Sequence, residues 1–406
     1  MSGSNICFFV PRRWRVAVFA VVLLMFAYLL LEPMIKSNLP IDVGCEYEIK
    51  DVIVTPESLG VGHCPICFGR NESICEGVIH NTVRLRRKKR ASLGDKWKPK
   101  ALGILNKDRI SIKHLGNISE FHKLDNELCS MVGTVNAPCE NDVVRKPFLN
   151  LSSIESVMKE TMYCPSERFI SKVKNIYIGE KLQKSQNSLR TLQLTSTLYV
   201  NQEPIIFQVF PSEKGWPFPK FYGACGRVII VEDAGLPLDY FLSYPWIERA
   251  KLALAVIKIA KQLSNNPEDW GLYMTEIALD NFAVSNGTVK LEDADGILVA
   301  DLSGSGIKAE REKTVDVCDW EETNCLSSHP AELCRGVIRD QNYYAVCRSV
   351  LSDIGSGKGL LHSPPEEGDF NNLLQEALTE CVTAQTLKRK EALDLVVSLL
   401  QKQIET

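Results

Sequence analysis

The segment from residue 272 to residue 301 constrains the fold more than any other part of the chain. Two apolar stretches, LYMTEIALDNFAV and LEDADGILVAD, carry acidic and amide side chains, which rarely enter a protein core without a partner or a task. The link between them reads SNGT, and an Asn-Gly pair between apolar runs is a strong signal for a two-residue hairpin turn. The sequence therefore predicts a hairpin with strands at 282–284 and 289–291.

A tight hairpin brings together the residues that flank its two strands. Asn281 precedes the first strand and Asp293 follows the second. An amide oxygen and a carboxylate at the open end of a hairpin suit Mg²⁺ or Mn²⁺, with nucleotide phosphates as the remaining ligands. Glu276 lies on the loop that leads into Asn281. The alternative is a Greek-key hairpin with exposed carboxylates.

This order of residues is that of a protein-kinase catalytic site, in which Asp-x4-Asn precedes a hairpin and a metal-binding Asp. On this hypothesis Glu276 is the catalytic base and Lys113, in the predicted strand ISIKHL, is the phosphate-binding lysine. Glu120 is its predicted ion-pair partner, with Glu127 as the alternative. The predicted strand GRVIIVED leads to the hinge for adenine, and Glu232 within it is assigned to nucleotide binding. The implied cofactor is ATP with Mg²⁺ or Mn²⁺.

The order of predicted elements is α+β, in a two-lobed arrangement. Strands are expected in PKALGIL, DRISIKHL, EPIIFQVF and GRVIIVED, and helices at 152–162, 166–173, 245–266, 370–383 and 387–403, with a further helix after Ser119. We expect an N-terminal lobe at 98–232 and a C-terminal lobe at 233–406.

The N-terminus predicts entry into the secretory pathway. Arg12, Arg13 and Arg15 precede an uncharged apolar run at 16–31, which is either a signal anchor or a signal peptide. No small-x-small cleavage site follows, which favours a type II anchor with residues 1–15 in the cytosol and a stem at 32–97. Both alternatives place the remaining chain in the lumen of the secretory pathway or outside the cell.

Glycosylation signals and cysteines agree with that location. Sequons begin at Asn71, Asn117, Asn150 and Asn286. Thirteen of the fourteen cysteines follow the apolar run, so most are expected in disulfides, and the odd number leaves at least one unpaired within the chain. Cys225 is the predicted buried free thiol. The stem motif HCPIC is read as part of a disulfide-pinned subdomain, with a zinc knuckle as the alternative.

The basic run RLRRKKR, residues 84–90, is expected to be a solvated loop. The alternative is a processing site cut after Arg90, which would release residues 91–406. A net charge of −3 argues against nucleic acid as a partner. The expected partners are a protein substrate or a cell-surface receptor, with membrane contact through 16–31.

Several motifs resemble those of the divergent protein kinase domain 2 family. They are CPICFG, ISIKHLG, GWPFPKFYGACGR, the segment from Tyr273 to Val284, DADGILVAD, QNYYAVC and GLLHSPP, which together span nearly the whole region after the anchor. The resemblance implies a protein-kinase-like fold and a protein that resides in the Golgi or is secreted and acts in signalling.

The sequence departs from ordinary kinases at several positions. Met274-Thr275-Glu276 stands where kinases have His-Arg-Asp, and Asp293-Ala294-Asp295 stands for Asp-Phe-Gly. No G-x-G-x-x-G precedes Lys113, and no Ala-Pro-Glu follows Asp293. These departures favour a pseudokinase or weak kinase with a metal and nucleotide pocket. The alternatives are an active lumenal kinase and a Golgi glycosyltransferase that uses Asp293-x-Asp295 for a metal.

Overall fold

The computed structural model describes residues 84–86, 100–105, 107–116, 123, 126, 154–177, 194, 197–225, 228–303, 330–354, 357–366 and 368–405. Contacts divide the chain into Met1–Glu46 and Tyr47–Thr406, and every described residue belongs to the second unit. Of the helix predicted after Ser119, Lys123 and Asn126 are described and both are helical. The rest of that helix and the apolar run at 16–31 lie outside the described residues. In the part of the chain that is described, no helix has both the length and the apolar character needed to cross a membrane.

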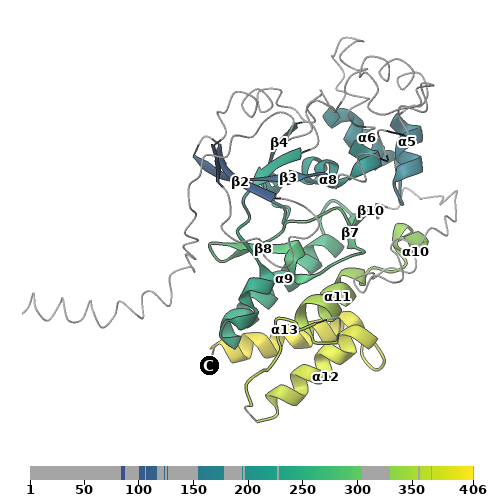
Figure 1. The fold of residues 1–406 in the computed structure, drawn as a ribbon. Helices are drawn as coiled ribbons and strands as arrows, with labels where there is room; N and C mark the ends of the chain where they lie inside the picture. Colours follow the sequence, from purple (N-terminus) through teal and green to yellow (C-terminus); the bar gives the residue numbers. More distant parts are fainter. Residues whose placement is uncertain are drawn as a thin grey trace, which may run out of the picture. The chain divides into compact units, whose positions relative to one another are not determined.

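A five-stranded antiparallel sheet forms the N-terminal part of the unit, in the order β1-β2-β3-β5-β4 (Figure 1). Its strands are β1 (Arg84–Arg86), β2 (Lys100–Leu105), β3 (Asp108–His114), β4 (Phe221–Cys225) and β5 (Val228–Glu232). β2 and β3 pair from Lys100 with Lys113 to Leu105 with Asp108, so the strands predicted in PKALGIL and DRISIKHL form an antiparallel hairpin. Lys107 takes a positive φ of 78°, as a tight hairpin turn requires.

The sequence predicted a solvated loop for the basic run at 84–90, and this is wrong for the start of the run. Its first three residues form β1, which pairs antiparallel with Leu102–Ile104 of β2 at the edge of the sheet. Arginine is common on edge strands, because a charged side chain there discourages pairing with another chain. The rest of the run, with the proposed cleavage site at Arg90, lies outside the described residues.

The helices whose bounds lie among the described residues before β4 are α5 (Ile154–Thr161), α6 (Glu167–Tyr177) and α8 (Glu203–Val209). The predictions of α5 and α6 are confirmed, and Ser166 begins α6 by accepting the Phe169 N–H on its hydroxyl. The strand predicted in EPIIFQVF is wrong, since this segment is α8. Almost every residue of α8 is buried, so the segment lacks the polar face that gives a helix its period, while Pro204 in the first turn suits a helix start.

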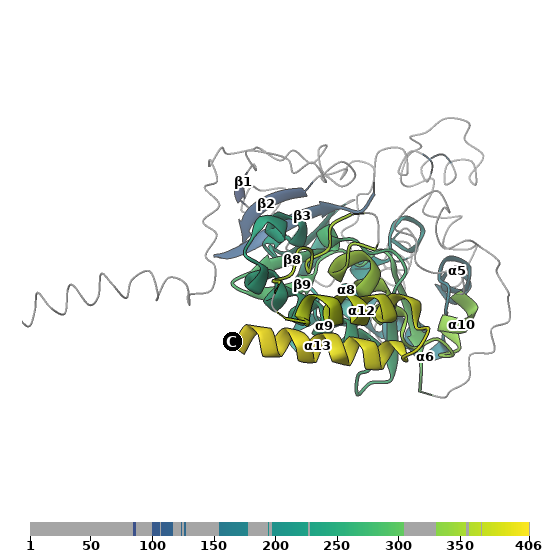
Figure 2. The same ribbon diagram turned by 90° about the horizontal axis from the view of Figure 1, so that it is seen from below.

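The C-terminal part is mainly helical and carries two small sheets. The order of the three-stranded sheet is β6-β8-β9, and β10 pairs with β7. The elements are β6 (Leu236–Pro237), α9 (Trp246–Ser264), β7 (Trp270–Met274), β8 (Phe282–Ser285), β9 (Thr288–Leu291), β10 (Ile297–Asp301), α10 (Pro330–Cys334), α11 (Gln341–Val346), α12 (Phe370–Thr383) and α13 (Arg389–Glu405). α12 and α13 run side by side in Figures 1 and 2, and α9 contacts both α11 and α13.

The long helix predicted at 245–266 is confirmed as α9, capped by Pro245 and Asn265. It buries Leu252, Val256 and Leu263 within the main core, as its apolar character on several faces predicts. The two predicted C-terminal helices are confirmed as α12 and α13. The α+β class therefore follows from the described elements.

Two disulfides occur within the described residues, which confirms that cysteines pair in this chain. Cys164 bonds to Cys334 of α10, and Cys347 bonds to Cys381 of α12. The side chain of Cys225 and the HCPIC motif lie outside the described part, so the free thiol and the zinc alternative stay predictions.

Candidate functional site

A buried ion pair forms the centre of the site. Lys113 on β3 is only 6% exposed, and its Nζ lies 2.5 Å from Oε1 of Glu203 on α8. The same nitrogen donates to the Glu292 carbonyl oxygen at 2.9 Å and lies 3.9 Å from Oδ1 of Asp293. A sheet strand, a helix and the segment after the β8–β9 hairpin therefore meet at one ammonium group.

The surroundings keep Lys113 charged. Burial alone would lower the pKa of Lys113, but the carboxylates of Glu203, Asp293 and Glu292 outweigh burial and raise this pKa above its usual value. A buried ammonium held in the charged state is suited to pair with an anionic ligand such as a phosphate.

Glu203 reaches Lys113 because the N-terminus of α8 is fixed. The Asn201 side chain accepts the Glu203 N–H at 2.8 Å and donates to the Leu115 carbonyl at 3.0 Å. Oε1 of Glu203 also accepts the Ala294 N–H at 3.1 Å. One carboxylate oxygen thus joins Lys113 to the backbone next to Asp293.

Sequence reasoning missed Glu203. It assigned the ion pair to Glu120, or alternatively Glu127, on the first helix expected after the strand, and both of these residues lie outside the described part. In the structure the carboxylate that contacts Lys113 comes from α8, 90 residues along the chain. The available signal was Glu203-Pro204, an acidic residue and a proline of the kind that opens a helix.

The predicted hairpin is confirmed. β8 and β9 pair from Phe282 with Leu291 to Ser285 with Thr288, which leaves Asn286 and Gly287 as the turn. Both turn residues have positive φ, 49° and 72°, as a type I′ turn requires.

The hairpin brings Asn281 and Asp293 together, as the sequence analysis expected. The Asn281 carbonyl oxygen accepts the backbone N–H of Glu292 at 2.8 Å and that of Asp293 at 3.2 Å. The Asp293 side chain is 25% exposed, and Oδ1 of Asn281 accepts the Ala278 N–H at 2.7 Å. An amide oxygen has a second lone pair, so the residues present fit a divalent cation whose other ligands come from a nucleotide.

No group of three His, Cys, Asp or Glu side chains forms a ready metal site in the part of the chain that the structure describes. This agrees with the chemistry of the pair, since Asn281 and Asp293 supply only one carboxylate. A cation there depends on phosphate oxygens for its remaining coordination.

Glu276, the predicted base, is exposed just after β7. The preceding Thr275 is fixed to the Gly296 carbonyl by its N–H at 3.1 Å and by its hydroxyl at 2.9 Å. A Cβ on Gly296 would lie 3.3 Å from the Glu276 Cβ, so the segments that carry Glu276 and Asp293-Ala294-Asp295 are in close contact.

The segment after Asp293 is held from α8 as well. The Gln202 side-chain amide donates to the Asp295 carbonyl at 3.2 Å and to the Ile297 carbonyl at 2.8 Å. Gln202 is a residue that sequence reasoning did not identify, since a single glutamine carries no motif. It is positioned to fix the loop that presents Asp293.

Glu232, assigned to nucleotide binding, takes part in a link between strands. Its carboxylate pairs with Lys290 Nζ of β9 at 2.5 Å and accepts the Lys220 N–H at 3.1 Å. Its side chain therefore ties β5 to β9, and its contact with a nucleotide stays a prediction.

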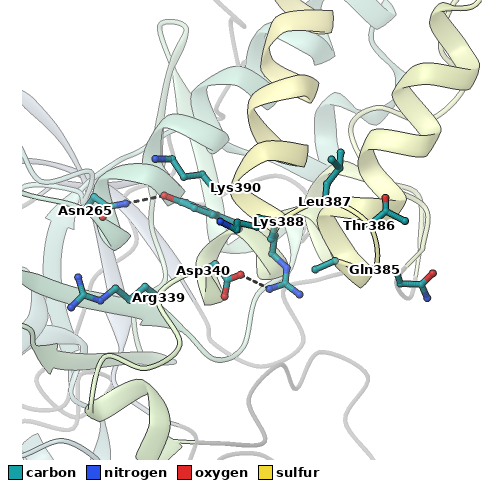
Figure 3. Close-up of a pocket in the computed structure, with 11 residues that line it drawn as sticks. Asn265, Arg339, Asp340, Gln385, Thr386, Leu387, Lys388 and Lys390 are labelled. Carbon is teal, nitrogen blue, oxygen red and sulfur yellow. Dashed lines mark hydrogen bonds and ion pairs between the residues drawn. The ribbon is translucent and has the colours of Figure 1, made fainter.

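A cavity of about 620 Å³ lies elsewhere, between the ends of α9 and α12 (Figure 3). Lys113, Glu203 and Asp293 do not line it. We place the candidate catalytic site at Lys113, because buried and paired ionisable groups identify such sites more specifically than cavity size.

Of the predicted glycosylation sites, only Asn286 lies within the described residues. It is exposed at the tip of the β8–β9 turn. Asn71, Asn117 and Asn150 lie outside them.

Comparisons with known proteins agree with this geometry. The model of the protein-kinase domain of FAM69 matches residues 195–384, which include Glu203, Asn281 and Asp293. Divergent protein kinase domain 2A of Homo sapiens is 32% identical over 360 residues, which cover 80% of this chain and 82% of the relative. The Xenopus tropicalis protein of that name is 31% identical over 356 residues, with the same two coverages.

A second group of relatives is more distant. Divergent protein kinase domain 2B of Homo sapiens is 24% identical over 351 residues, covering 78% of this chain and 77% of the relative. Identity, coverage and the kinase-domain match together show that the chain belongs to the divergent protein kinase domain 2 family, with a kinase-like domain of mixed helices and strands.

Proposed function

We propose that this chain is a pseudokinase or weak kinase that binds a nucleotide with a divalent cation and acts in Golgi or extracellular signalling. The observation that carries the nucleotide site is the buried Lys113–Glu203 ion pair, with the Asp293 carboxylate 3.9 Å from the lysine nitrogen. This arrangement places a fixed positive charge beside a partly exposed carboxylate, which suits a metal–phosphate ligand.

The residues divide the work of binding. Lys113 would pair with a phosphate, Glu203 would orient Lys113, and Asp293 with Asn281 would hold Mg²⁺ or Mn²⁺. The cation, when bound, would neutralise phosphate charge. The weak activity that we propose follows from Glu276, because its longer side chain displaces the carboxylate from the position of the usual aspartate, and misplacements of about 1 Å can cost about 10²-fold in rate.

Thermal stabilisation tests the binding step. We expect ATP with Mg²⁺ or Mn²⁺ to raise the melting temperature of the full chain and expect Asp293→Ala to lose that shift. Asp295→Ala is the matched control, because its backbone contacts with Gln202 survive the substitution. The absence of a metal-dependent shift in the wild-type protein would contradict a nucleotide site.

An active kinase is the second candidate, favoured by the exposure of Glu276 beside the Asp293 segment. Glu276→Gln should then abolish phosphoryl transfer from radiolabelled ATP while the thermal shift by ATP and Mn²⁺ is retained. If the wild-type protein binds ATP but transfers no phosphate, the pseudokinase assignment stands.

The proposed location rests on the N-terminal sequence, the four sequons and the pairing of cysteines. An enzyme that removes N-linked glycans should shift the apparent mass of the expressed protein. A protein that shows no such shift, and that a protease digests in intact microsomes, would contradict a lumenal location.

A further inference from the structure

The candidate site lies at one end of the two-stranded sheet formed by β7 and β10. The strands pair antiparallel, with Met274 opposite Ile297 at one end and Trp270 opposite Asp301 at the other. The segments that carry the proposed base and the proposed cation ligand join this sheet at the Met274–Ile297 end, which is its site end. Two strands alone are at best marginally stable, so the position of the site depends on what holds this sheet.

One arginine of α6 contacts both residues of the far end, Trp270 and Asp301 (Figure 1). Nη1 of Arg168 lies 2.8 Å from Oδ1 of Asp301, and the guanidinium carbon lies 3.9 Å from the centre of the Trp270 ring. Nη2 of Arg168 donates to the Glu268 carbonyl, just before β7. A planar guanidinium can stack on a ring and donate to two acceptors at once. Arg168 therefore joins α6, β7 and β10 at one point.

The pair of Arg168 with Asp301 is shielded from water. The side chain of Asp301 is only 2% exposed. Burial would raise the pKa of Asp301, but hydrogen bonds from Ser303 and Arg168 outweigh burial and lower this pKa below its usual value. A charged carboxylate that accepts from a guanidinium makes a stronger hydrogen bond than a neutral pair does. The far end of the sheet is thus held by a persistent contact.

The start of α6 is itself fixed to the sheet. Cys164, which precedes α6, is bonded to Cys334 of α10, and α10 contacts β10. Cys164 also packs in a small core with Leu298 and Ala300 of β10. The disulfide and this packing hold the first turn of α6 in the place from which Arg168 reaches Asp301.

The site end of the same sheet is held by α8. Gln202 donates to the Ile297 carbonyl at 2.8 Å, and Glu203 accepts the Ala294 N–H at 3.1 Å. α6 and α8 are joined to each other, since Gln208 of α8 donates to the Tyr177 hydroxyl of α6 at 2.5 Å. Two connected helices therefore hold the two ends of β10.

We propose that Arg168 is a positioning residue for the nucleotide and cation site, an inference that rests on the proposed function of that site. By fixing the far end of β10, Arg168 sets the place of Asp293 at the site end. In ordinary protein kinases the placement of the metal-binding Asp is controlled by phosphorylation of the segment that follows it. In this chain α6 would provide a comparable support without a covalent modification.

Titration calorimetry of the full chain with ATP tests this role, once with Mn²⁺ and once with a metal chelator. Arg168→Met keeps an apolar stem on Trp270 and removes the bonds to Asp301 and Glu268. We expect it to weaken binding of ATP with Mn²⁺ by about twofold to thirtyfold, the range found when residues along a contact network are replaced. Binding of ATP with the chelator should change less, because Lys113 lies on β3. Equal losses with metal and with chelator would overturn the positioning role.

Lys172→Met is the matched control. Lys172 lies one turn further along α6 and over the same Trp270 ring, but its ammonium pairs with the Glu268 carboxylate, which precedes β7, at 2.8 Å. Lys172→Met should leave both affinities unchanged. Arg168→Lys is a milder second variant, which keeps a charge for Asp301 but loses the planar stack, and it should bind ATP with Mn²⁺ more tightly than Arg168→Met does.

Hydrogen–deuterium exchange tests the inference without any nucleotide. Arg168→Met should speed exchange of the β10 amides and of the Ala294 amide at the site end, while the amides of α13 keep their wild-type rates. Lys172→Met should leave all of these rates unchanged. The inference is overturned if Arg168→Met alters exchange only near Asp301, or if the two variants act equally. A wild-type protein that binds no ATP would contradict the proposed function instead, and the exchange rates would still decide whether Arg168 fixes the Asp293 segment.

Discussion

At the scale of single residues, Lys113 and Glu203 show how a buried charge pair is made tolerable. Each charge is removed from water, which costs several kcal/mol unless hydrogen bonds replace the lost hydration. Lys113 gains the Glu292 carbonyl and Glu203 gains the Ala294 N–H in addition to each other. The pair is satisfied as a unit, so neither member can be removed alone without penalty.

Lys113→Met should lower the free energy of unfolding by about 3–5 kcal/mol, because it leaves the Glu203 carboxylate buried without its counter-charge. Lys113→Met combined with Glu203→Gln should cost less than the sum of the two single substitutions. Urea unfolding of the wild type, Lys113→Met, Glu203→Gln and the double variant measures this coupling. Strictly additive costs would show that the pair contributes no interaction energy.

The pH dependence of this pair has a definite sign. Because the folded-state pKa of Lys113 is raised, its contribution is fully present below the usual lysine pKa and is lost only as pH rises through the folded value. The stability difference between wild type and Lys113→Met/Glu203→Gln, in which no unpaired Glu203 carboxylate remains, should therefore be the same at about pH 6 and about pH 8, well below the ordinary lysine pKa of about 10.4. Urea unfolding at both values checks this.

Gln202, the N-cap of α8, and Gln208, within α8, offer a matched comparison. Gln202→Ala removes the bonds to Asp295 and Ile297, whereas Gln208→Ala removes bonds to the Tyr177 hydroxyl and the Pro204 carbonyl. Each should cost about 1–2 kcal/mol of stability. Only Gln202→Ala should also weaken stabilisation by ATP and Mn²⁺. Equal effects on nucleotide binding would exclude a positioning role for Gln202.

At the scale of secondary structure, the elements that short sequence signals determine were predicted correctly. The Asn-Gly turn and the helices predicted at 166–173 and 245–266 are confirmed, the helices as α6 and α9. α8 was predicted as a strand because its partners come from distant parts of the chain, which bury almost all of it and remove its polar face.

Gly235, in the link between β5 and β6, occupies a position that has no room for a side chain. A Cβ there would lie 1.9 Å from the Val284 carbonyl oxygen, at a φ of 98°. Gly215 has a similar φ of 88°, with nothing within 4 Å of its virtual Cβ. Gly215→Ala should cost about 1–2 kcal/mol from backbone strain, and Gly235→Ala at least about 2 kcal/mol more from the collision. Equal urea midpoints for Gly215→Ala and Gly235→Ala would contradict the close approach of Gly235 to the Val284 carbonyl.

At the scale of the whole molecule, the candidate site was predictable only in part. Asn281 and Asp293 are joined by a hairpin that the sequence specifies, so their convergence could be predicted. The pairing of Lys113 with Glu203 spans 90 residues and depends on how α8 packs. No local pattern encodes such a contact, and the sequence analysis accordingly assigned it to the nearer Glu120.

The two described disulfides should differ in their effect on global stability. Cys164–Cys334 closes 170 residues, and Cys347–Cys381 closes 34. Under the chain-entropy model, replacing both cysteines by serine should cost about 5 kcal/mol for the first and about 4 kcal/mol for the second. Guanidinium unfolding of the two variants provides the comparison. A larger loss for the shorter loop would mean that native packing, rather than unfolded-chain entropy, dominates.

The exposed turn at Asn286-Gly287 also makes the site vulnerable to chemical ageing. An asparagine followed by glycine can cyclise through its amide onto the next backbone nitrogen, and the isoaspartate that results inserts an extra atom into the main chain. A two-residue turn has no slack to absorb that atom, so the register that sets Asn281 beside Asp293 would shift. A sugar attached to the Asn286 amide would block the cyclisation. Glycosylation there would then protect the positions of the cation ligands from slow isoaspartate formation.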